Sequence, residues 1–131
     1  MKLFAITARA LLSIIGLALI VLGVLFWTGR ALALLPFHML LGALFVVCLW
    51  ILVALALLVR AARGLALVTL AWSLVVLVLG VTQLRLLPGS SHWVVQSMHL
   101  AVGLIAMGLG HALARATLAM SVVTRPAPEH A

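Results

Sequence analysis

Four long uncharged stretches make up most of the chain, and single basic residues separate them. The uncharged runs are residues 10–29, 31–59, 64–84 and 86–114. Each run exceeds the roughly 18 apolar residues that indicate a membrane-spanning helix. Backbone groups in lipid must be satisfied within the segment, and the runs lack the alternation of barrel strands, so we expect helices. The pattern predicts helices near residues 6–27, 35–59, 65–84 and 92–120.

Small and polar residues recur at steps of three and four along one face of each predicted helix. Since lipid supplies no hydrophobic force between helices, small residues and polar groups mark the packed faces. The sequence therefore predicts an all-α, up-and-down membrane bundle of four helices in which these faces meet. The faces comprise Ser13, Gly16, Ile20, Gly23 and Trp27; His38, Gly42 and Phe45; Thr69, Ser73, Val76, Gly80 and Gln83; and His92, Gln96, His99, Gly103, Ala106 and Gly110.

Composition agrees with a lipid environment. Hydrophobic residues make up 68% of the chain and charged residues 7%, whereas soluble domains carry about 25% charged residues. The net charge of +7 does not indicate a nucleic-acid partner, because the basic residues are scattered singly rather than clustered. The bilayer is thus the first partner that the sequence predicts.

The basic residues predict the topology instead. Two of them, Arg30 and Arg85, fall on one side of the predicted bundle, and the other six fall on the opposite side. By the positive-inside rule this asymmetry puts both termini in the cytoplasm. One lysine against seven arginines is typical of a bacterial protein, so we expect the bacterial cytoplasmic (inner) membrane. The six residues on the predicted cytoplasmic side are Lys2, Arg9, Arg60, Arg63, Arg115 and Arg125.

We expect one transmembrane domain over residues 1–123 and a short polar tail over 124–131. The interval from Arg30 to Arg60 equals that from Arg85 to Arg115, which favours two repeated helical hairpins. Any two hairpins that span the same bilayer would share this spacing, so the alternative of no repeat stays open. Residues 31–33, Ala-Leu-Ala, resemble a signal-peptidase site, but the apolar run before them is longer than a signal peptide's, and we expect the first helix to be retained.

The predicted helices contain no carboxylate, because the only acidic residue is Glu129 in the tail. Ion-coupled transporters usually place Asp or Glu on the ion path. Paired-carboxylate hydrolysis and a Ser-His-Asp arrangement also need such a group. The polar chemistry that remains inside the membrane is imidazole.

Two helices carry the same motif, His-x-x-x-Gly, at His38/Gly42 and His99/Gly103. In an up-and-down bundle the second and fourth helices are diagonal, and bundles build cofactor sites between facing helices. A neutral imidazole ligates haem iron, and a glycine one turn away leaves room for a flat macrocycle. The sequence therefore predicts a haem between these helices, with His38 and His99 as iron ligands.

Residues 37–42 (Phe-His-Met-Leu-Leu-Gly) and 98–103 (Met-His-Leu-Ala-Val-Gly) resemble motifs of small bacterial b-type cytochromes related to cytochrome b561. The resemblance covers the second and fourth helices only. It implies one haem b with two histidine ligands, and electron transfer between quinone and a second acceptor. Family members with two haems need a second histidine pair, for which only His111 is available here, so at most one haem per chain is implied.

His92 competes with His99 for the role of second ligand. Arginine spacing makes His92 level with His38, whereas His99 lies on the order of 10 Å deeper at 1.5 Å per residue. We favour His99 because Gly103 follows it; His92 would then meet a haem propionate or a quinone at the outer surface. Arg30 and Arg85, in the outer connections, are candidate partners of the propionate carboxylates through paired N–H donors.

Two other functions stay open at this point. In the first, the chain is a non-catalytic membrane subunit or assembly factor, and its histidines hold helices together by hydrogen bonds. In the second, His38, His92 and His99 form a metal site or channel that binds zinc or copper. The sequence does not distinguish an electron carrier from an oxidoreductase, and it is compatible with a homo-oligomer and with a separate redox partner.

Overall fold

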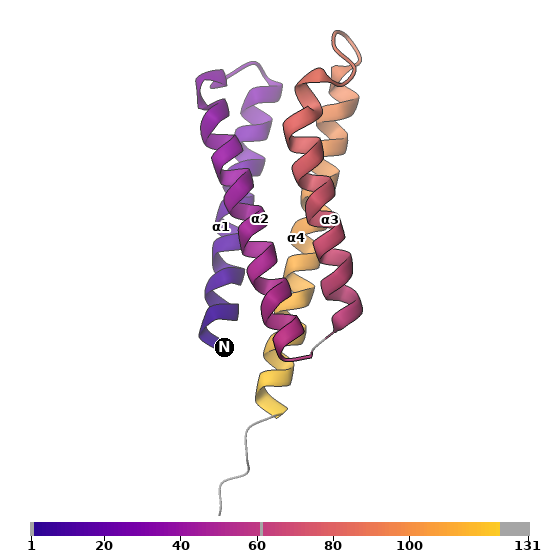
Figure 1. Ribbon diagram of the computed structural model, residues 1–131. Helices are drawn as coiled ribbons and strands as arrows, with labels where there is room; N and C mark the ends of the chain where they lie inside the picture. Colours follow the sequence, from indigo (N-terminus) through magenta and orange to yellow (C-terminus); the bar gives the residue numbers. More distant parts are fainter. Residues whose placement is uncertain (1, 61, 124–131) are drawn as a thin grey trace, which may run out of the picture.

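The computed structural model describes residues 2–60 and 62–123, and this part of the chain is almost entirely helical (Figure 1). The four long helices are α1 (Lys2–Trp27), α2 (Leu35–Leu58), α3 (Arg63–Thr82) and α4 (His92–Val123). Two short 3-10 helices lie in the connections, η1 (Leu32–Leu34) before α2 and η2 (Gln83–Arg85) after α3. The predicted all-α bundle of four helices is confirmed. The tail 124–131, with Arg125, lies outside the described residues.

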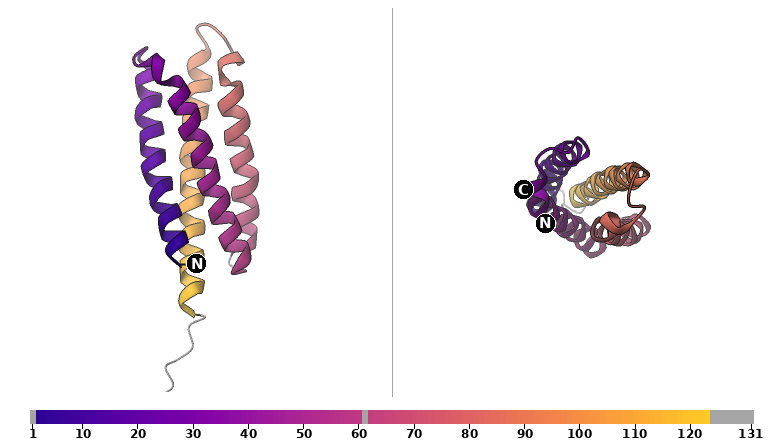
Figure 2. Two further views of the ribbon diagram at one scale, coloured as in Figure 1. Left: turned by 60° about the vertical axis from the view of Figure 1, so that its left-hand side comes forward. Right: turned by 90° about the horizontal axis from the view of Figure 1, so that it is seen from above.

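Neighbouring helices in sequence are neighbours in space, and they run alternately in opposite directions (Figure 1). Helix α4 also contacts α1, so the four helices close a ring, as the view along the bundle shows (Figure 2). Helices α2 and α4 touch across this ring, whereas within the described ranges α1 and α3 do not. The expected diagonal relation of α2 and α4 is therefore present, and it is the shorter diagonal.

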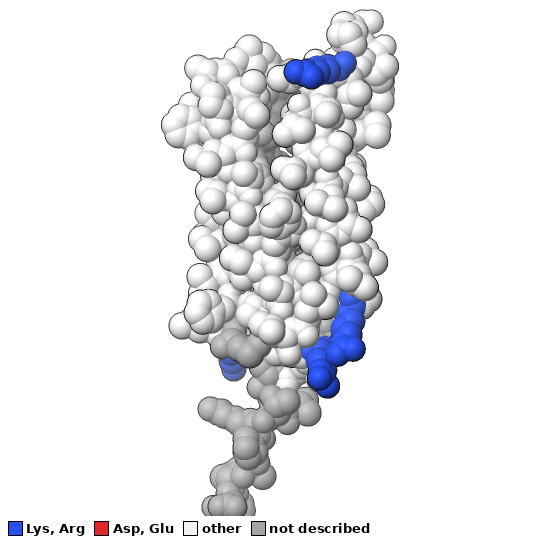
Figure 3. Space-filling view, viewed as in Figure 1, with Lys and Arg blue, Asp and Glu red and all other residues white. Residues whose placement is uncertain are grey.

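All four helices are long and apolar enough to cross a membrane. Figure 3 shows Lys and Arg at the two ends of the visible face, with an uncharged surface between them. We call the end that carries the N-terminus the basic end and the opposite one, with Arg30 and Arg85, the far end. The chain is a multi-pass membrane protein. The basic end carries Lys2, Arg9, Arg60, Arg63 and Arg115.

The observed helix bounds differ from the predicted ones mainly at the start of α1 and at the end of α4. Helix α1 begins at Lys2 rather than near residue 6, and α4 continues to Val123 rather than ending near 120.

Gly29 and Gly89, with φ of 73° and 92°, lie in the two connections at the far end. Glycine adopts this left-handed conformation without the steric cost of a Cβ atom, which suits both tight reversals.

The buried core occupies one half of the bundle. The buried residues of α1 end at Gly16, those of α2 begin at Phe45, and those of α3 end at Ser73. We call this the packed half; it is the half next to the basic end. The loose half comprises residues 17–44 and 74–105, and Val95 is the one buried residue that the structure describes there.

The predicted helix faces do meet inside the bundle. Of the residues assigned to them, all but one are buried or half-buried. The exception is Trp27, which is 44% exposed at the far end of α1, so its assignment to the packed face was wrong. The buried members are Gly16, Phe45, Thr69, Ser73, Ala106 and Gly110.

Two glycines of α4 allow a matched test of close packing. A Cβ atom at Gly110 would meet Leu12, and also Leu49 Cδ2 at 2.8 Å, whereas a Cβ at Gly108 would meet nothing within 4 Å. Both leucines are fully buried and have little room to move. We expect Gly110→Val to destabilise the protein by about 1–3 kcal/mol, because overpacking costs that much, and Gly108→Val to do so clearly less.

Thermal unfolding of the detergent-purified variants measures this difference. Both substitutions place the same β-branched side chain in the same helix, so the change in helix propensity cancels. Equal melting temperatures for the two variants would contradict the close packing of α4 against α1 and α2.

Candidate functional site

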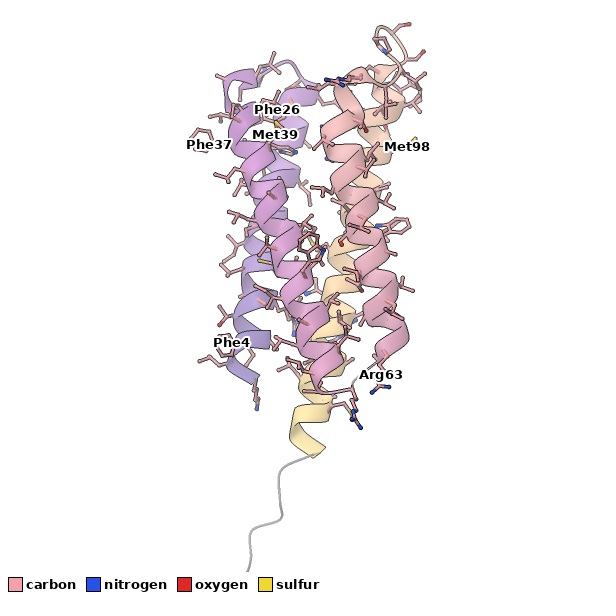
Figure 4. The ribbon with its side chains drawn as sticks, viewed as in Figure 1. Phe4, Phe26, Phe37, Met39, Arg63 and Met98 are labelled. Carbon is pink, nitrogen blue, oxygen red and sulfur yellow. The ribbon has the colours of Figure 1, made fainter. Side chains whose placement is uncertain are left out.

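Helices α2 and α4 bring His38 and His99 together in the loose half. The two ring centroids lie 6.3 Å apart, and the ring planes are inclined by 50°. Both side chains are half-buried. Their neighbours Phe37 and Met98 are mostly exposed and extend outward from the bundle (Figure 4), so the histidines occupy the inner faces of the two helices.

The depth difference inferred from arginine spacing does not separate this pair. His38 lies in the first turn of α2, whereas His99 lies two turns into α4, and the two rings are nevertheless neighbours. Helix α4 therefore begins farther out than α2. His92, seven residues before His99 and about 10 Å away along the axis, is displaced toward the far end.

The other two helices also contact the histidine pair. The ring of Phe26 in α1 meets the His38 ring edge-on, with centroids 5.3 Å apart and planes at 67°. In α3, Gly80 faces His99: a Cβ atom there would lie 3.6 Å from His99 Cε1. The site is thus lined by all four helices.

Space is available beside the two histidines. A Cβ atom added at Gly42 or Gly103, one turn from each histidine, would meet nothing within 4 Å, and the same holds for Gly23 of α1. Close helix packing therefore does not explain these three glycines, although it does explain Gly16, whose added Cβ would clash with Met107. A side chain at Gly42 or Gly103 would thus meet open space one turn from its histidine.

The histidine side chains have no polar partner in the part of the chain that the structure describes. Nδ1 of His38 and Nδ1 of His99 are both buried and without a hydrogen bond there. A buried polar atom without a partner costs free energy. Interhelical hydrogen bonds, as expected for a purely structural role, are not formed by this pair within the described ranges.

The remaining candidate residues lie at the far end, apart from the pair. His92 Nδ1 is 3.2 Å from the Leu86 carbonyl oxygen, a contact within the α3–α4 connection. Arg30 and Arg85 are exposed. Within the described ranges no three His, Cys, Asp or Glu side chains gather where they could share a metal ion, so a zinc or copper site that includes His92 is not assembled.

Two tryptophans form interhelical hydrogen bonds at the boundary between the halves, and the sequence did not predict these bonds. Trp50 Nε1 of α2 donates to Ser73 Oγ of α3 at 2.8 Å, and Trp72 Nε1 of α3 donates to the Val102 carbonyl oxygen of α4 at 3.0 Å. A tryptophan in mid-helix was the available signal, because its N–H needs a partner when the ring is away from the membrane surface. The partner itself was not predictable.

Comparison of the chain with protein-family models, with curated proteins and with solved structures finds no match. The resemblance to cytochrome b561-related proteins therefore depends on the two short motifs alone. The fold and the site define a multi-pass four-helix membrane protein with a histidine pair between its diagonal helices.

The Trp50–Ser73 bond can be measured by a double-mutant cycle. We expect Trp50→Phe and Ser73→Ala to be coupled by about 0.6–2 kcal/mol of unfolding free energy, the range for hydrogen bonds between membrane helices. Equilibrium unfolding in mixed detergent micelles provides the free energies of unfolding. Trp93→Phe, at an exposed tryptophan on α4, serves as the control and should show no coupling to Ser73→Ala. Additive single changes at Trp50 and Ser73 would contradict the bond.

Proposed function

We propose that this protein is a membrane electron carrier that binds one b-type haem between α2 and α4, and that His38 and His99 are the residues that would hold its iron. The observation that carries the proposal is the centroid distance of 6.3 Å between their rings. Two imidazoles that share one metal ion, with metal–nitrogen bonds of about 2 Å, can have centroids about 6 Å apart. The spacing thus suits a shared iron atom.

The chemistry of the site supports the same ligand. Two imidazoles without protein partners are a suitable donor set for haem iron, and a ligand there would offset the cost of burying them in the membrane. Open space at Gly42 and Gly103 lies one turn from each donor. When bound, haem supplies one-electron chemistry, with a potential set by ligands, burial and nearby charges.

The protein's own residues have distinct parts in this proposal. His38 and His99 would hold the iron, while Phe26 contacts the His38 ring and Gly80 lies beside the His99 ring. Arg30 and Arg85 lie at the same end of the bundle and are the proposed partners of the haem propionates. Membrane quinone is the electron partner that we propose, on the resemblance to cytochrome b561-related proteins.

A non-catalytic membrane subunit is the second candidate function. The ring contacts from Phe26 to His38 and from His38 to His99 favour it, because such contacts can serve helix packing alone. In that case the purified protein is colourless, and the histidines are replaceable by residues of similar size.

The visible spectrum of the purified protein separates the two functions. For a haem protein we expect a strong Soret band and sharp bands on reduction. His38→Ala and His99→Ala should each reduce haem content at least tenfold, because each removes one iron ligand. His92→Ala and His111→Ala are matched controls that should keep the spectrum. A wild-type protein that stays colourless after haem is supplied during expression would exclude the haem proposal.

We also propose that the protein lies in a bacterial cytoplasmic membrane with both termini in the cytoplasm. Five basic residues gather at the basic end and two at the far end of the described chain, and basic residues are retained on the cytoplasmic side. The proposed haem site then lies in the outer half of the membrane.

Reporter fusions test this orientation. Alkaline phosphatase fused after Gly89 should be active, because the connection between α3 and α4 would face outward. The same enzyme fused to the C-terminus should be inactive, whereas a fluorescent protein there should fluoresce. The reverse pattern would contradict the proposed orientation without affecting the haem assignment.

A further inference from the structure

A second site lies at the basic end, remote from the histidine pair. A pocket of about 200 Å³ opens between α1 and α4. The packed half of the bundle separates it from His38 and His99. Its walls are both basic and apolar. The lining residues are Ile6, Arg9, Ala10, Ser13 and Leu118.

The polar wall of the pocket joins the two helices. Ser13 Oγ donates to the Arg9 carbonyl oxygen at 3.0 Å. Ser13 Oγ also lies 3.4 Å from His111 Nε2 of α4. When the Ser13 hydroxyl proton is used in this way, His111 Nε2–H is the donor to Ser13. The other ring nitrogen, His111 Nδ1, is buried and has no hydrogen-bond partner in the described part of the chain.

The pocket is electropositive. Arg9 lines it, and Arg115 lies one turn after His111 on α4. Both arginine side chains are exposed. The described ranges contain no Asp or Glu, so no acidic side chain there neutralises this cluster. A ligand of the pocket should therefore carry negative charge.

The apolar wall adds a second requirement. Ile6 and Leu118 line the pocket, and the neighbouring outer surface of α1 exposes large apolar side chains such as Leu3 and Ile14, at 74% and 66%. A small free anion would leave this surface unused. An anionic headgroup attached to hydrocarbon chains fits both walls.

We propose that this pocket binds the phosphate headgroup of an acidic phospholipid, with Arg9 as its main charged contact and the acyl chains along the outer face of α1. Guanidinium groups donate paired hydrogen bonds to phosphate. Basic pockets between membrane helices at the surface are suited to such headgroups. The site does not depend on haem, so it can be tested whatever the histidine pair binds.

Native mass spectrometry of the full chain in detergent tests the proposal, with phosphatidylglycerol and phosphatidylcholine titrated separately. We expect one phosphatidylglycerol per chain to be retained in preference to phosphatidylcholine. Arg9→Gln should weaken retention about fivefold, as expected for the loss of one basic residue near a lipid surface. His111→Gln should also weaken it.

Arg63→Gln is the matched control. Arg63 is also an exposed arginine at the basic end (Figure 4), but it belongs to α3, which does not contact α1 in the described ranges. Its loss should leave lipid retention unchanged. Since the Arg9 side chain is exposed, Arg9→Gln should fold normally.

Several results would overturn the proposal. Equal losses for Arg9→Gln and Arg63→Gln would show a general surface-charge effect, and equal retention of the two lipids would exclude headgroup recognition. Inorganic phosphate at millimolar concentration that displaces the lipid in an Arg9-dependent manner would indicate a free-anion site. Displacement by a soluble quinone with the same dependence would assign the pocket to quinone instead.

Discussion

Close approach of helices in the packed half is the constraint on which the remaining structure depends. Lipid surrounds the bundle, so burial of apolar surface does not hold the helices together as it does in water, and van der Waals contact between well-fitted surfaces must do so. Gly16 and Gly110 provide this fit, because the side chains of Met107, Leu12 and Leu49 occupy the space that a Cβ atom would take. These contacts set the direction of α1, α2 and α4.

A bundle held firmly in one half can leave the other half loosely packed. The loose half contains the two histidines, the glycines without neighbours and a single buried apolar residue, Val95, among those described. The Trp50–Ser73 and Trp72–Val102 hydrogen bonds connect neighbouring helices at the boundary between the halves. The buried core and the candidate histidine site therefore lie at different depths along the bundle.

Much of this arrangement was predictable from the sequence, and the rest was not for identifiable reasons. Uninterrupted apolar runs predicted the helices, and helical spacing of polar and small residues predicted the inner faces. The difference between Gly110 and Gly103 could not be predicted, because both are glycines on the same face of one helix and only the facing helices distinguish them. Arginine spacing suggested that His92 is level with His38. This inference failed because the spacing does not reveal how far α4 extends beyond α2.

The parallel direction of α2 and α4 has an electrostatic consequence. Both helices begin at the far end, so their peptide dipoles point the same way and place partial positive charge there. His38 lies within the first turn of α2, where this field is strongest. The field stabilises negative charge beside His38, so the fold favours an anionic or electron-rich group at this site even without a nearby formal charge.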